Sequence, residues 1–126
     1  MNALHPWLLV AVGGALGAVL RYGAAAAINR WAQSLFPFGT LAVNVLGCLL
    51  IGYVMMSLPR TGEWRESLRL LLVTGMLGGF TTFSSFSWET VGLIEEGRVA
   101  YALGNVALSL ALCLLATFAG IWLARH

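Results

Sequence analysis

The feature that most constrains this chain is a series of four long apolar segments separated by short polar connections. The segments cover residues 7–28, 39–58, 68–94 and 99–124, and each is close to the ~20 residues that an α-helix needs to cross ~30 Å of hydrocarbon. Of the 126 residues, 60% are hydrophobic and 10% are charged, whereas an average soluble domain is roughly 25% charged. We therefore expect an all-α integral membrane protein with four transmembrane helices, forming a single membrane domain over residues 1–126.

Several classes of protein are excluded by the same pattern. The connections leave no room for an enzyme or sensor domain outside the membrane. No nucleophile–base pair is visible, since His5 and His126 are terminal, and a net charge of +2 without a basic run gives no case for nucleic-acid binding. Cys48 and Cys113 lack the paired spacing of a disulfide or zinc site, so we interpret them as small buried apolar residues. The first segment lacks the basic leader of a signal peptide and is expected to remain as a helix.

The distribution of arginine gives only a weak signal for orientation. With an even number of spans, both termini and the second connection lie on one side of the membrane. That side holds four arginines and the other holds two, with a third near its face: Arg60, Arg65, Arg69 and Arg125 against Arg30, Arg98 and Arg21. By the positive-inside rule this difference is small. It fits either a weakly biased single orientation or insertion in both orientations, which would suit an antiparallel homodimer.

The third apolar segment contains a predicted break near mid-membrane. Gly78–Gly79 is followed at once by Thr81–Thr82, and both glycine and β-branched residues disfavour a continuous helix. Non-helical backbone at membrane depth is tolerated only when it is buried in protein or lines a wet cavity, and in transporters such breaks mark ion sites. The alternative is a glycine kink whose threonine hydroxyls bond back to the preceding turn.

Phenylalanine recurs every third residue through this stretch, at Phe80, Phe83 and Phe86, with Ser84–Ser85 between the last two. Aromatic residues at helical spacing usually serve packing. The edge of a phenyl ring carries positive partial charge, however, so rings that alternate with hydroxyl donors can also face an anion without holding it tightly, as conduction requires. The stretch therefore indicates an element for ion permeation.

Two further polar residues lie inside apolar segments. Arg21 stands about one turn before the end of the first segment, where its side chain either snorkels to the interface or provides a fixed cation beside an aqueous vestibule. Asn44 lies early in the second segment, where its amide either joins helices or faces a polar cavity. The small-residue pairs Gly13/Gly17 and Gly75/Gly79 indicate closely packed helices.

Together these motifs resemble the Fluc/CrcB family of fluoride channels over essentially the whole chain. Three blocks carry the resemblance: GALGAVLRY at residues 14–22, Gly39–Thr40 with Asn44 and Gly47, and GGFTTFSSF at residues 78–86 followed by Glu89. The resemblance implies a multi-pass protein of the cell inner (plasma) membrane that passively exports fluoride. It also implies an antiparallel, dual-topology homodimer with two fluoride pathways. A structural Na⁺ would lie at the dimer interface, held by the main-chain carbonyls of Gly78 and Thr81 from both subunits.

The resemblance also assigns roles to individual side chains. The ring edges of Phe83 and Phe86 would meet fluoride, with Asn44 as an amide donor and Ser84 and Ser85 as hydroxyl donors. Thr40 would contribute to the vestibule, and Arg21 would be its fixed cation. Ser109 would make a polar contact from the fourth helix, and Glu89 would be a hydrogen-bond acceptor that orients the serine hydroxyls. Two residues depart from the family pattern. Phe80 replaces an aliphatic residue, and Asn105 stands where some members carry an aromatic hydroxyl.

A passive pore is sufficient for export because an inside-negative potential drives an anion outward with about 2.3 kcal/mol per 100 mV. A small four-helix proton-coupled exporter is the alternative function. It would need a protonatable carboxylate at mid-membrane, usually in the first helix, and that segment contains none. A subunit that serves assembly alone would leave the Phe–Ser–Ser–Phe pattern unexplained.

Overall fold

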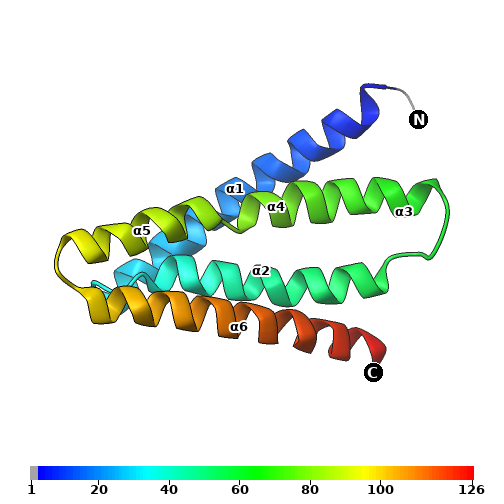
Figure 1. The fold of residues 1–126 in the computed structure, drawn as a ribbon. Coiled ribbons are helices and arrows are strands. Elements are labelled where there is room, and N and C mark those ends of the chain that lie inside the picture. Colours follow the sequence, from blue (N-terminus) through cyan, green and yellow to red (C-terminus); the bar gives the residue numbers. More distant parts are fainter. Residues whose placement is uncertain (1–2) are drawn as a thin grey trace.

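The computed structural model describes residues 3–126, so Met1 and Asn2 of the predicted domain lie outside the described part. Four helical stretches are long and apolar enough to cross a membrane, and no strand occurs in residues 3–126 (Figure 1). The first, second and fourth are α1 (His5–Ala32), α2 (Phe38–Ser57) and α6 (Val99–Arg125). The third crossing, Glu63–Glu95, consists of α3 (Glu63–Leu68), η1 (Arg69–Leu77), α4 (Gly78–Phe80) and α5 (Phe83–Glu95). The predicted all-α architecture with four spans is confirmed.

Two helices extend beyond the apolar segments that predicted them. The third crossing begins at Glu63 rather than near residue 68, because acidic residues favour the first turn of a helix and Glu66 pairs with Arg69 at 2.7 Å. Helix α1 continues past residue 28 to Ala32. Asn29, directly after the predicted segment, accepts a hydrogen bond from the backbone N–H of Gly39 through its Oδ1 at 2.9 Å. It thereby ties the end of α1 to the start of α2.

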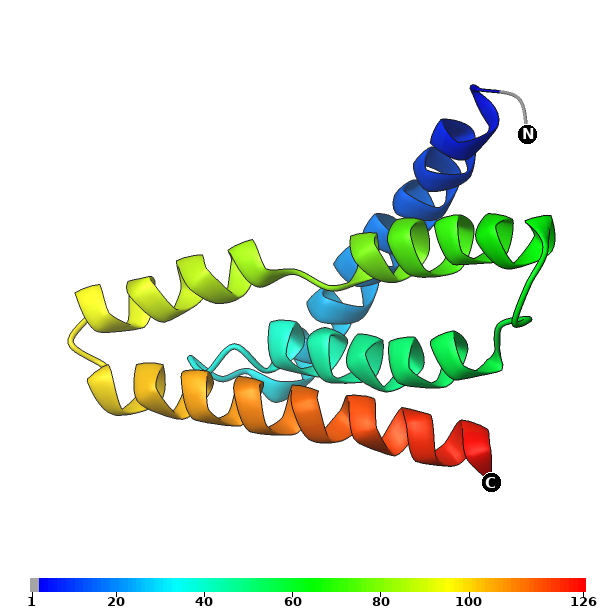
Figure 2. The ribbon, with the colours of Figure 1, turned by 45° about the vertical axis from the view of Figure 1, so that its right-hand side comes forward.

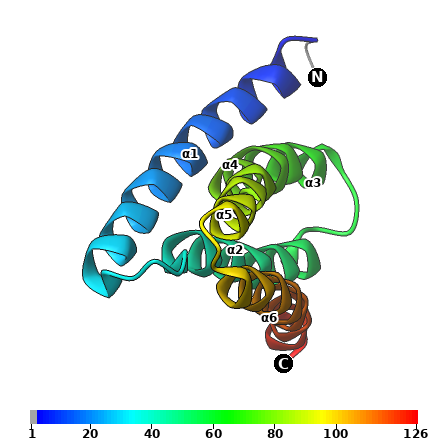
Figure 3. The same cartoon turned by 60° about the vertical axis from the view of Figure 1, so that its left-hand side comes forward.

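Glycines allow the backbone of α1 to contact the backbone of the third crossing. A Cβ atom added to Gly13 or Gly17 would fall on the carbonyl oxygen of Leu71 or Met76 respectively, and one on Gly79 would lie 2.6 Å from the carbonyl oxygen of Gly14. The two small-residue pairs predicted from the sequence therefore pack against each other. In the end-on view α1 runs obliquely across this crossing (Figure 3).

Helices α2 and α6 form the other close pair, and they run side by side in the same direction (Figures 1 and 2). Gly52 packs against the carbonyl oxygen of Thr117, and Gly120 packs against that of Leu49. Helix α5 rests on α6 and makes few contacts with α2.

Apolar side chains cover the outside of the subunit. The exposed set includes all five tryptophans, four of which stand near helix ends: Trp7, Trp31, Trp64 and Trp122, with Trp88 on α5. Tryptophan is enriched where a membrane meets water, so the first four are placed for an interfacial belt. The fold presents an apolar surface suited to lipid or to a second subunit.

Candidate functional site

The third crossing is interrupted at Thr81 and Thr82, directly after the Gly78–Gly79–Phe80 turn. Thr81 has an extended backbone (φ −96°, ψ 158°), as has Thr82 (φ −152°, ψ 112°). The two halves continue in nearly the same direction with a modest bend (Figure 2). Thr82 caps the new helix, because its Oγ1 accepts a hydrogen bond from the backbone N–H of Ser85 at 3.1 Å. The Thr81 hydroxyl bonds back to the carbonyl oxygen of Leu77 at 3.0 Å, so both sequence interpretations of this stretch describe part of the geometry.

Asn44 on α2 pairs with the backbone that the break exposes. Its Oδ1 accepts from the N–H of Thr82 at 2.7 Å, and its Nδ2 donates to the carbonyl oxygen of Thr82 at 3.1 Å. An unpaired buried peptide group would cost several kcal/mol at membrane depth. Asn44 therefore joins α2 to the break, and it also borders a cavity.

Arg21 does not snorkel to the interface. Its Nε donates to the carbonyl oxygen of Gly79 at 2.9 Å, which lost its helical partner, the N–H of Phe83, when the helix broke. The guanidinium is thus fixed beside the break by a charge-assisted hydrogen bond.

The carbonyl oxygens of Gly78 and Thr81 are left with free acceptor capacity. In a continuous helix they would accept from the N–H groups of Thr82 and Ser85, which bond instead to Asn44 and to the Thr82 hydroxyl. Within residues 3–126, no hydrogen bond outside the helices ends on either oxygen. Gly78 is exposed on the surface of the single subunit.

One side of the break opens into a cleft of about 240 Å³, here called the charged cleft. Its polar lining comes from α1, α2 and the third crossing and includes Arg21, Thr40, Thr82, Ser85 and Glu89. The Thr40 hydroxyl donates to Glu89 Oε1 at 2.6 Å, while Glu89 Oε2 is buried without a hydrogen-bond partner. The prediction that Glu89 orients the serine hydroxyls is wrong in its donor, since the donor is Thr40.

The serine hydroxyls gather around Thr82 instead of reaching Glu89. The Thr82 hydroxyl donates to Ser85 Oγ at 3.1 Å and lies 3.2 Å from Ser84 Oγ. This geometry follows from the helix cap, which places the side chains of the first turn around the capping oxygen. Ser84 is exposed and does not line the charged cleft.

A second cleft, also about 240 Å³, lies on the α6 side and is here called the aromatic cleft. It is lined by Asn44, Cys48, Thr81, Thr82, Phe83, Phe86, Ser109, Leu110, Cys113 and Leu114. The ring centroids of Phe83 and Phe86 are 5.4 Å apart with the planes tilted by 54°. Phe83 is 76% exposed in the single subunit. The two clefts share Thr82 and together contain eight of the nine predicted pore residues.

The two departures from the family pattern have structural roles. Phe80 is buried, and its ring lies close to Gly47, so it packs the core beside the break. Asn105 is 2% exposed, and it donates to the Thr90 hydroxyl at 2.9 Å and accepts from Ser109 at 3.3 Å. Its amide therefore joins α6 to α5 within the protein.

Sequence reasoning assigned no site role to two residues that hold the site together, Thr82 and Thr90. Thr82 links both clefts, and a threonine at the start of a helix is a cap signal that could have identified it. Thr90 donates to the carbonyl oxygen of Phe86 at 2.7 Å and accepts from Asn105. Only the alignment of α5 on α6 identifies that link.

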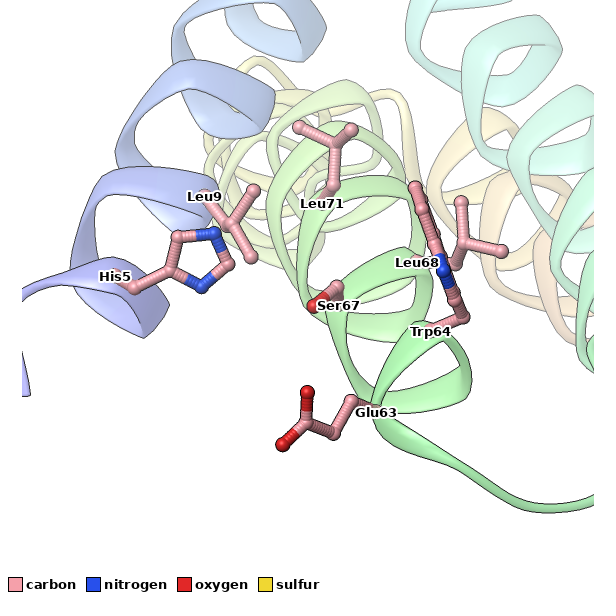
Figure 4. Close-up of a pocket in the computed structure, with 7 residues that line it drawn as sticks. All are labelled: His5, Leu9, Glu63, Trp64, Ser67, Leu68 and Leu71. Carbon is pink, nitrogen blue, oxygen red and sulfur yellow. The ribbon is translucent and has the colours of Figure 1, made fainter. Parts of the chain in front are cut away.

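A third cleft, of about 420 Å³, lies away from the break between the start of α1 and the start of the third crossing (Figure 4). His5 and Glu63 border it from opposite helices, together with Ser67 and apolar side chains, and none of the predicted site residues lies there. No group of three or more His, Cys, Asp or Glu side chains that could hold a metal occurs in residues 3–126.

Comparisons with known proteins agree over nearly the full chain. A family model described as CrcB-like protein, Camphor Resistance (CrcB), matches residues 8–121. A protein of Geobacter sulfurreducens named "Fluoride-specific ion channel FluC" is 52% identical, with 94% of this chain and 96% of that protein aligned. Proteins with the same name from Rhizobium etli and Flavobacterium psychrophilum are 48% and 40% identical, with at least 93% of this chain covered.

Proposed function

The chain belongs to the CrcB-like protein family, and we propose that it is a fluoride-selective ion channel that passively exports fluoride from the cell. The observation that carries this function is the similarity, 52% and 48% identity over 94% of this chain, to proteins named as fluoride-specific ion channels. The protein is a multi-pass membrane protein and not an enzyme. The proton-coupled alternative has no support, since α1 contains no acidic residue.

The aromatic cleft is the proposed path of the ion. Phe83 and Phe86 line it from α5, while Asn44 and Ser109 supply polar groups from the neighbouring helices. The positive edge of a phenyl ring attracts an anion weakly, and a weak site permits both entry and release. Asn44 uses one amide hydrogen on the backbone of Thr82, which leaves its second hydrogen for the ion.

The charged cleft is the proposed vestibule. Arg21 is fixed at the break, where its positive charge would raise the local concentration of an anion. Ser85 and Thr82 present hydroxyls between this cleft and the aromatic cleft, with Ser84 beside them. Glu89 accepts the Thr40 hydroxyl, and this pairing keeps one carboxylate oxygen engaged away from the anion.

The functional unit is proposed to be an antiparallel, dual-topology homodimer in the plasma membrane. Three observations support it: the small arginine bias between the two sides, the apolar outer surface, and the exposure of Phe83 in a single subunit. A ring that is 76% exposed needs a second wall to form a closed path, and a second subunit can provide it.

A structural Na⁺ is proposed at the interface of the two subunits. The main-chain carbonyls of Gly78 and Thr81 fit this role because they have free acceptor capacity, and hard cations prefer oxygen ligands. The ion would satisfy the carbonyls that the break exposes, with the same pair contributed by each subunit.

Flux from liposomes tests the function directly. With the protein reconstituted and a potassium diffusion potential applied, we expect rapid fluoride efflux and no chloride efflux. Absence of fluoride efflux, or equal efflux of chloride, would refute the channel. For the sodium site, replacing Na⁺ by N-methylglucamine should lower the melting temperature of the dimer, and an unchanged value would remove the ion from the proposal.

A further inference from the structure

Cys48 on α2 and Cys113 on α6 both border the aromatic cleft. The two helices run in parallel (Figure 1), and Gly52 packs against Thr117. Cys48 and Cys113 each stand four residues earlier, and residues four apart share a helix face. Both thiols are free and half-buried, and the register of the two helices and their shared cleft place them near each other.

We propose that Cys48 and Cys113 form a two-thiolate site for a soft divalent metal ion that prefers linear coordination, such as Hg²⁺, and that its occupation closes the fluoride path. The closure rests on the proposed function, whereas the binding does not. Thiolates select soft metals. Within residues 3–126 no third His, Cys, Asp or Glu joins the pair, so zinc, which takes four ligands in structural sites, is poorly suited.

The binding reaction involves no oxidation or reduction. Two S–H bonds break, two S–Hg bonds form, and the two protons pass to water. The product, Cys48–S–Hg–S–Cys113, is uncharged. An uncharged product suits this depth because net charge inside a membrane is costly. Monovalent Cu⁺ or Ag⁺ would leave a charge of −1 in the same reaction, and this disfavours them here.

The position of the site connects binding to permeation. The cleft has a volume of about 240 Å³ and also holds Phe83, Phe86, Ser109 and Asn44, so a metal between the thiols occupies part of the same space. A soft ion has little affinity for hard fluoride and would obstruct its passage. Because the second thiol binds intramolecularly, the pair should hold the metal roughly 10²–10⁴-fold more tightly than either thiol alone.

The test exposes purified protein to Hg²⁺, challenges it with a monothiol such as glutathione, and measures the mercury that remains per chain. Wild type should retain one equivalent, whereas Cys48→Ala, Cys113→Ala and the double variant should retain none. Alanine is small and apolar, so the α2–α6 contact should persist. If either single variant retained as much mercury as wild type, or if wild type retained none, the paired site would be refuted.

Fluoride efflux from liposomes then tests the closure. Hg²⁺ should slow wild-type efflux on the order of tenfold or more, equivalent to about 1.4 kcal/mol at the barrier, and excess dithiol should restore it. The double variant should be unaffected. Unchanged wild-type efflux with mercury retained would refute the closure. A lack of fluoride efflux before any treatment would refute the proposed function instead, and mercury retention by solubilised protein would still decide the site.

Discussion

Residues 69–80 and residues 83–95 belong to one membrane crossing, yet they contact the rest of the subunit in different ways. The first half, η1 and α4, meets α1 backbone to backbone through glycines. The second half, α5, is held by side-chain hydrogen bonds at Thr82, Glu89 and Thr90, and its Phe83 and Trp88 are exposed. The break at Thr81–Thr82 separates the two.

The difference shows how one helix can combine a closely packed half with a half whose aromatic and polar side chains border the proposed ion path. Close backbone contact leaves no room for side chains between η1 and α1, so the packing of this half contributes mainly to the stability of the fold. Helix α5 turns rings and hydroxyls toward the clefts and uses few of them in packing. Substitutions in the first half should therefore change stability, and those in the second should change flux.

The largest effect is expected when alanine replaces a glycine in the first half, with a glycine in the second half as the control. A Cβ at Gly79 would lie 2.6 Å from the carbonyl oxygen of Gly14, whereas a Cβ at Gly92 would meet nothing within 4 Å. Gly79→Ala should lose about 1–3 kcal/mol through overpacking, with loss of folded protein and of flux. Gly92→Ala should be neutral or slightly stabilising. Thermal melting followed by size-exclusion chromatography measures both, and equal behaviour of the two variants would remove the contrast.

Asn44 provides the next test because it fastens the second half at the break. Asn44→Ala leaves the N–H and the carbonyl of Thr82 without these partners, which should cost about 1–3 kcal/mol and reduce fluoride flux. Leu46→Ala is the control, since Leu46 is on the same helix and exposed. Melting temperatures in detergent compare the two variants. If Asn44→Ala had the same melting temperature as wild type, the Asn44 amide would not stabilise the break.

Phe86 and Phe80 separate permeation from packing. Phe86→Ile should slow fluoride efflux by about tenfold, equivalent to about 1.4 kcal/mol at the barrier, while the protein stays folded, because isoleucine has no positive ring edge. Phe83→Ile should behave alike. Phe80 is buried beside Gly47, so Phe80→Ile should lower stability more than flux. Efflux rates and melting temperatures are measured together. An unchanged rate in Phe86→Ile would assign that ring to packing.

The smallest effect is expected at the cap of α5. Thr82→Val removes the oxygen that accepts from Ser85 N–H and should cost about 1 kcal/mol, with a modest reduction in flux. Thr82→Ser keeps the oxygen and should match wild type in both measurements. If Thr82→Val matched wild type in both measurements, the hydroxyl cap would not stabilise the start of α5.

The sequence predicted the four crossings and the break because both depend on local properties. Hydropathy over ~20 residues reports a span, and Gly78–Gly79 beside two threonines weakens a helix wherever it lies. The predicted ends of the helices were less accurate. The third crossing begins at Glu63 rather than at residue 68, because a polar first turn can be helical although hydropathy does not detect it. The break itself could be predicted, but the use of the groups that it frees could not.

Those uses are decided by partners that lie far away in the chain. Arg21 meets Gly79 across 58 residues, Thr40 meets Glu89 across 49, and Asn44 meets Thr82 across 38. For each polar residue the sequence indicated that a partner was required, since polar groups at membrane depth must be satisfied. Only the close approach of the helices at their glycines determined which of these distant groups came within hydrogen-bond distance, and so placed Glu89 on Thr40.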